Sequence, residues 1–150
     1  MPYRILILEG VRDEAAARRE THVQSASSLA QHRFEHIYAA EHVALDETQP
    51  IRVRLMQSQK KALDENDVLT RLNQRVTAFQ PDILLVHSGT LFQSCPNELM
   101  HVLQTLKALH PEVRIGFKPR SFERYGPKAF FEYTMEMRDL MADVFANGTK

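Results

Sequence analysis

Two short runs of consecutive apolar residues constrain the fold of this chain more than any other feature. Residues 5–8 and 83–86 contain only Ile, Leu and Val, and Gly10 and Pro81 stand close to them. A strand with one solvated face alternates apolar and polar residues, whereas a strand covered on both faces does not alternate. We therefore expect strands at 3–8 and 82–86, buried on both faces, with Gly10 ending the first.

Three other segments have strand character. Residues 34–40 predict one strand, and residues 113–117, which lie between two prolines, predict another. Residues 51–55 alternate apolar and basic side chains, as a half-buried strand does, and we interpret them as an edge strand. The alternative is that Pro50 begins a long helix running toward Phe79.

The segments between these strands carry apolar residues at helical spacing. We expect four helices. The first is rich in alanine, the second has Asp64 or Asn66 as its N-cap, the third has Pro96 in its first turn, and the last buries a stripe of Met, Leu and aromatic residues. Their expected ranges are 14–31, from 64 or 66 to 79, 96–109 and 128–145.

Strands that alternate with helices predict a parallel sheet with helices on both faces. The chain has 150 residues, of which 43% are apolar, and this length suits one domain with one core. We therefore expect a single α/β domain over residues 1–150, with three layers and a doubly wound, mostly parallel sheet of four to five strands.

Charge and cysteine content limit which binding partners and which cellular compartment we expect. Nineteen basic residues balance nineteen acidic ones, so the whole chain has no net charge to attract nucleic acid, and nucleic acid is an unlikely partner. No apolar run approaches the roughly 20 residues that a membrane helix needs, and no signal-peptide pattern opens the chain. The single cysteine suits a reducing compartment. We expect a soluble, cytoplasmic protein without a membrane partner.

In parallel α/β sheets, ligands bind beyond the carboxyl ends of the strands. The polar residues that follow the three expected central strands should therefore converge at one edge of the sheet. They are Glu9, Gly10 and Asp13 after the first strand, His87 and Ser88 after the strand at 82–86, and Lys118 after the strand at 113–117.

Each of these candidates has two interpretations. Glu9 and Asp13 offer oxygen ligands to a divalent cation, but we favour an ion pair between Glu9 and Lys118, with Asp13 capping the first helix. Residues 87–90 offer an imidazole, two hydroxyls and a glycine amide to an anion, but an ordinary turn explains them better. No phosphate-binding loop or dinucleotide fingerprint occurs in the chain.

Other chemistry-bearing residues are weaker candidates. Cys95 next to the expected helix start is better explained as a small packed residue than as a nucleophile. His32 and His36 have helical spacing but straddle the start of a strand, so we expect no metal there. We interpret the cationic residues Lys118, Arg120 and Arg124, with Arg114 and His110 nearby, as a solvated face.

Together these segments resemble a receiver domain of two-component signalling, which implies a flavodoxin-like fold. Residues 4–10 resemble the family's first strand, with Glu9 matching the first acid of its magnesium-binding pair and Gly10 replacing the second. Residues 80–87 resemble the strand that ends in the phosphoacceptor aspartate, and His87 occupies that place. Lys118 and Pro119 resemble the family's lysine–proline pair. The resemblance covers residues 3–40 and 78–145; the segment 41–66 is longer than the family's pattern, and the lysine–proline pair comes one strand–helix unit early.

The resemblance implies a pseudo-receiver that is not phosphorylated and acts through a protein partner in signalling or regulation. We expect no cofactor and no metal, and we lean against an enzyme. The partner would contact the last helix and residues 118–125, with Arg120, Phe122, Arg124 and Tyr125 on the surface. A homodimer through an edge strand or a helix face is also compatible with this architecture. The alternative function is a small enzyme or ligand-binding protein for a phosphorylated or carboxylated metabolite.

Overall fold

A computed structural model of the chain describes residues 2–11, 14–26, 29–40, 64–87, 96–117 and 135–145. Within these residues, four strands form one parallel sheet in the order β2-β1-β3-β4. The strands are β1 Arg4–Val11, β2 Arg33–Ala40, β3 Ile83–Val86 and β4 Arg114–Phe117, and the helices are α1 Glu14–Ser25, α3 Glu65–Phe79, α5 Pro96–Leu109 and α7 Met135–Val144. None of these helices is long and apolar enough to cross a membrane.

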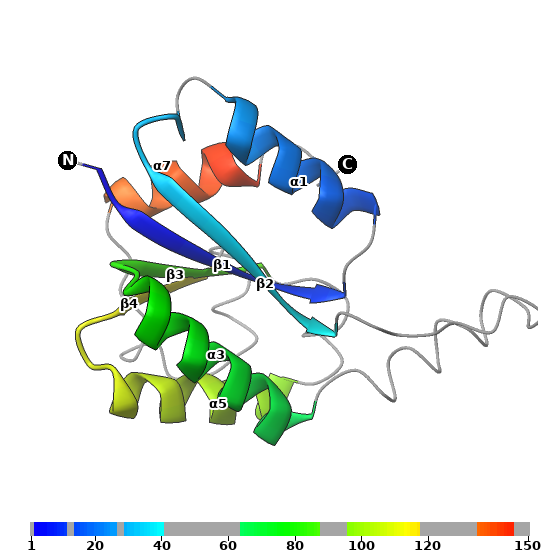
Figure 1. Ribbon diagram of the computed structural model, residues 1–150, viewed down its shortest axis with the longest axis vertical. Coiled ribbons are helices and arrows are strands. Elements are labelled where there is room, and N and C mark those ends of the chain that lie inside the picture. Colours follow the sequence, from blue (N-terminus) through cyan, green and yellow to red (C-terminus); the bar gives the residue numbers. More distant parts are fainter. Residues whose placement is uncertain are drawn as a thin grey trace, which may run out of the picture.

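The helices cover both faces of the sheet. Figure 1 shows α1 and α7 on one side of the strands and α3 and α5 on the other. The expected α/β fold, with parallel strands between helices, is confirmed for the described part of the chain.

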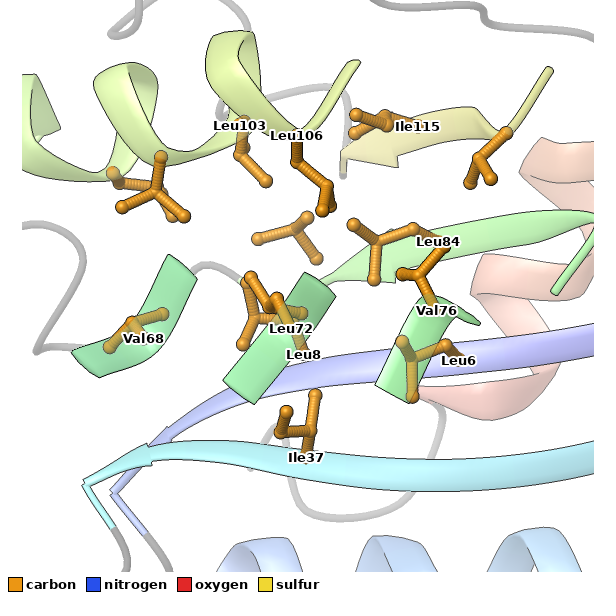
Figure 2. Packing of buried hydrophobic residues seen from close by; sticks show 14 of the residues in the cluster. Leu6, Leu8, Ile37, Val68, Leu72, Val76, Leu84, Leu103, Leu106 and Ile115 are labelled. Carbon is orange, nitrogen blue, oxygen red and sulfur yellow. The ribbon is translucent and has the colours of Figure 1, made fainter. Parts of the chain in front are cut away.

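The face covered by α3 and α5 holds the larger of two apolar clusters. Leu6 and Leu8 of β1 point to this side, where they meet Leu84 of β3 and the buried stripe of α3 (Figure 2). Both leucines are fully buried. Burial of one such side chain contributes about 1.5–3 kcal/mol, so this cluster stabilises the sheet against both helices.

The opposite face is packed by α1 and α7. Ile5 and Ile7 alternate with the two leucines along β1, so they point to this side and pack in the second apolar cluster. The prediction that residues 5–8 and 83–86 are buried on both faces is confirmed, since all eight side chains are inaccessible to solvent. Gly116 of β4 also faces α7, and a Cβ atom there would lie 2.6 Å from Cε of Met137. The glycine therefore allows α7 to approach the sheet closely.

α3 begins where Asp64 caps it. Asp64 has extended backbone angles, φ −88° and ψ 107°, and its carboxylate accepts a hydrogen bond from the amide of Asp67 at 3.1 Å. This geometry is an N-cap, as predicted. Because the backbone of Asp64 is extended, one continuous helix does not run from Pro50 to Phe79. The edge strand expected at 51–55 lies outside the described residues.

Two element boundaries differ from the sequence prediction. α1 ends at Ser25, six residues before the expected end at Gln31. The Leu29 amide donates to the carbonyl oxygen of Ala26 at 3.1 Å, and the His32 amide donates to that of Leu29 at 3.0 Å, so tight turns stand where the last helical turns were expected. β1 also continues past Leu8, because pairing with β2 extends it through Gly10 to Val11.

The described part of the last helix keeps the predicted orientation. Its apolar positions Met137, Leu140, Met141 and Val144 are buried against the sheet, whereas Arg138 and Asp139 are exposed. The expected start of this helix at residue 128 lies outside the described residues.

Candidate functional site

Three polar side chains form a row across the carboxyl ends of β2, β1 and β3. Glu9 pairs in register with Tyr38, and the backbone amide of His87 donates to the carbonyl oxygen of Leu8 at 2.9 Å, so His87 continues the β1–β3 ladder. Residues at alternate positions share a face, which places Tyr38, Glu9 and His87 on the side covered by α1 and α7. The structure therefore brings Glu9 and His87, two candidates from different loops, into one row.

The carboxylate of Glu9 is held by Arg19 of α1. Nε of Arg19 donates to both carboxylate oxygens of Glu9 at 3.0 Å, and Nη2 donates to Oε1 at 2.5 Å. Both side chains are buried, with exposed fractions of 1% for Glu9 and 4% for Arg19. The guanidinium neutralises the carboxylate and uses both of its oxygens.

Arg19 is a partner that the sequence interpretation, which expected Glu9 to pair with Lys118, did not include. Lys118 lies outside the described residues, and the Glu9 carboxylate has Arg19 as its partner. The sequence held one signal for Arg19: it stands three residues after Ala16 and four before Val23, both buried. An arginine at an apolar position of a helix stripe indicates a buried charge that needs a partner.

His87 lies between the Glu9 carboxylate and an aromatic ring. Its Nδ1 is 3.4 Å from Oε1 of Glu9, and its ring centroid is 5.0 Å from that of Phe145, with an angle of 40° between the planes. The exposed fraction of the His87 side chain is 15%. The imidazole is therefore fixed by packing on one side and by the charged pair on the other.

A second histidine, His36, lies on β2 two residues before Tyr38, and it pairs in register with Ile7 of β1. Burial lowers its pKa from 6.5 to about 4; the Glu20 charge acts in the opposite sense, and Arg19 lowers the pKa further. Among the described residues, its buried Nε2 has no hydrogen-bond partner. His36 is therefore neutral at pH 7.

His32 and His36, the two histidines considered above as metal ligands, have different surroundings. Nδ1 of His32 accepts a hydrogen bond from the Tyr3 amide at 3.0 Å, and its ring stacks on Tyr3 at the amino end of β1. In the parts of the chain that the structure describes, no group of three or more His, Cys, Asp or Glu side chains has the geometry to hold a metal ion.

The other candidates are separated from this row or lie beyond the description. Gly10 follows Glu9 on β1 and therefore belongs to the opposite face of the sheet. Arg114 and His110 lie at the amino end of β4. Outside the described residues are Asp13, Ser88, Gly89, Thr90, Cys95, Lys118, Arg120, Phe122, Arg124 and Tyr125.

Comparisons with models of protein families, with curated proteins and with solved structures find no match for this chain. The contacts of Glu9, Arg19 and His87 are therefore the main evidence for its function. Chemically, the row is a neutralised carboxylate with a fixed imidazole beside it, covered by α1 and α7.

Proposed function

We propose that this chain is a receiver-like regulatory domain that acts by binding a protein partner and is not itself phosphorylated. The observation that carries the proposal is the buried, bidentate ion pair between Glu9 and Arg19. In a receiver domain, the acid at the position of Glu9 binds magnesium. A carboxylate whose two oxygens both accept from a buried guanidinium can bind a cation only if that ion pair breaks, at a cost of several kcal/mol.

The strand order supports a flavodoxin-like, doubly wound arrangement. The order β2-β1-β3-β4 matches the first four positions of the flavodoxin-like order 2-1-3-4-5. In that arrangement, His87 takes the place of the phosphoacceptor aspartate at the end of β3. An imidazole cannot accept phosphate there with the magnesium-bridged geometry of a carboxylate. Phosphoryl transfer is therefore not the signal that this domain reads.

We place the partner surface on α7 and on the segment before it. Arg120, Phe122, Arg124 and Tyr125 combine aromatic and cationic side chains, as interface centres do. At the start of α7, Met135 has an exposed fraction of 65%, so this side of the domain presents a large apolar side chain. A filled, ion-paired row at the carboxyl ends of the strands favours recognition over catalysis.

The test is capture of a partner by the full chain with and without acetyl phosphate and magnesium. We expect the same specific partner under both conditions, its loss with Phe122→Ala/Tyr125→Ala, and its retention with Arg18→Ala/Arg33→Ala, which removes two exposed arginines of α1 and β2. We also expect no acid-labile adduct on the chain. An adduct on Glu9 or Asp13, or a partner that binds only after acetyl phosphate, would show that the proposal is wrong.

A small-molecule role is the second candidate, and the contact between His87 and Glu9 favours it. An imidazole beside a carboxylate is a common arrangement for a general base, and His87 keeps some exposure to solvent. The substrate or ligand would be a phosphorylated or carboxylated metabolite. A panel of phosphates, carboxylates and nucleotides should then raise the melting temperature by several degrees, and His87→Ala should abolish the shift. The regulatory proposal predicts no such shift.

A further inference from the structure

β2 is the outermost strand on its side of the described sheet. Its Arg33 amide donates to the carbonyl oxygen of Tyr3 at 2.9 Å, so Arg33 and every second residue after it face β1. By alternation, the backbone groups of Phe34, His36 and Tyr38 point away from the sheet. An eight-residue edge of this kind is a template for pairing with another strand.

Two arginines of α3 bind the carbonyl groups on this edge. Nη1 of Arg71 donates to the outward carbonyl oxygen of Tyr38 at 2.6 Å. Its Nη2 also donates, at 2.9 Å, to the carbonyl oxygen of Ala39, which is not one of the outward positions. Nη1 of Arg75 donates to the carbonyl oxygen of His36 at 3.3 Å. The outward carbonyls of His36 and Tyr38 therefore both accept from guanidinium groups.

The spacing of the two arginines matches the spacing of the two carbonyls. Four residues of a helix rise about 6 Å, and two residues of a strand advance about 6.6 Å. Arg71 therefore lies opposite Tyr38, and Arg75 lies opposite His36. About one turn of the helix spans the same length as two residues of the strand. Asp67 accepts from Nε of Arg71 at 3.1 Å, and Glu35 accepts from Nη1 of Arg75 at 3.0 Å, so each guanidinium is also held by a carboxylate.

We infer that Arg71 and Arg75 close the β2 edge to strand addition by a second copy of this chain. A second β2 is the partner that this edge fits, because two identical edges related by a two-fold axis offer each other the same donors and acceptors. Its amides would need the carbonyls that the guanidinium groups now occupy. The inference does not depend on the proposed function, since it concerns a different edge of the sheet.

The test compares Arg71→Ala/Arg75→Ala with the wild-type chain by sedimentation over a range of concentrations. We expect the variant to gain a concentration-dependent association of copies, and hydrogen exchange at the amides of Phe34 and His36 to slow as it associates. Arg18→Ala/Arg138→Ala is the control, because it removes the same charge from exposed positions on other helices. A folded double variant that sediments like the wild type at every concentration would overturn the inference.

Arg75→Ala alone provides a second, milder test if the double variant does not fold. This change removes the hydrogen bond to His36 and a pair with Glu35 whose side chains are each 39% exposed, so its effect on stability is small. We expect association at concentrations at which the wild type does not associate, and its absence, with unchanged exchange at the edge amides, contradicts the inference.

Discussion

Arg19 and Glu9 are separated by ten residues along the chain and by 3.0 Å between Nε and each carboxylate oxygen. The acid lies near the carboxyl end of β1, and α1 returns across the sheet so that its second turn places the guanidinium directly over it. Because both charges are removed from water, each depends on the other. This interdependence gives the first prediction.

Replacing Arg19 with Met should lower the free energy of unfolding by about 3–5 kcal/mol, because it leaves a buried carboxylate without its partner. Urea denaturation measures the change. The matched control is Arg18→Met, since Arg18 is the preceding residue of α1 and is exposed, and this change should stay within about 0.5 kcal/mol. Adding Glu9→Gln to Arg19→Met should recover part of the loss. Equal effects of the Arg18 and Arg19 variants would contradict the described ion pair.

The stability of the protein should fall as the pH is lowered from 7.5 to 5. The pKa of His36 is about 4 in the folded chain, below its ordinary value of 6.5, so the unfolded chain binds the proton more tightly. Stability is therefore full above pH 6.5 and is lost as the pH falls toward 4, by roughly 2 kcal/mol at pH 5. Urea denaturation at each pH measures this slope.

His36→Phe should flatten that pH dependence, because phenylalanine fills a similar volume and does not titrate. His101→Phe is the control, since His101 is exposed on α5, and this variant should keep the wild-type slope. If His36→Phe and the wild type lose the same free energy between pH 7.5 and 5, burial of His36 is not the cause of the slope.

The strands of the sheet could be predicted because a strand that is buried on both faces has consecutive apolar residues in the sequence. Residues 5–8 have no polar break, as is typical of a strand with both faces covered. The meeting of Glu9 and His87 then follows from topology, because both residues lie at the carboxyl ends of neighbouring parallel strands. Arg19 was missed because a charged residue is normally assigned to the solvated face of a helix, and only its partner explains its burial.

The boundaries of α1 and β1 were harder to predict for a physical reason. Alanine favours continuation of a helix, so the pattern extended to Gln31, but the carbonyl oxygens of Ala26 and Leu29 accept hydrogen bonds from amides three residues on, which form tight turns. Gly10 suggested a turn, whereas pairing with β2 keeps it in the strand. In both cases a specific hydrogen bond outweighed local propensity.

The N-cap of α3 gives a third prediction. Asp64→Ala should lower the free energy of unfolding by about 1 kcal/mol, because the Asp67 amide loses its acceptor. Asn66→Ala is the control, since Asn66 was the other cap candidate in the sequence and its side chain is exposed within the helix. Thermal and urea denaturation should show little change for it. A larger loss for Asn66→Ala would mean that the helix begins later than the structure has it.

Gly116 provides the last prediction, because it sets the distance between β4 and α7. Gly116→Ala places a Cβ atom 2.6 Å from Cε of Met137 and 3.4 Å from Cδ2 of Leu85. Overpacking of this kind costs about 1–3 kcal/mol, and the flexible end of the methionine side chain places the expected loss near the lower value. Met137→Leu removes the clashing atom, so it should cost less in the Gly116→Ala background than in the wild type. A double-mutant cycle by urea denaturation measures this coupling, and additive effects would mean that the two residues do not touch.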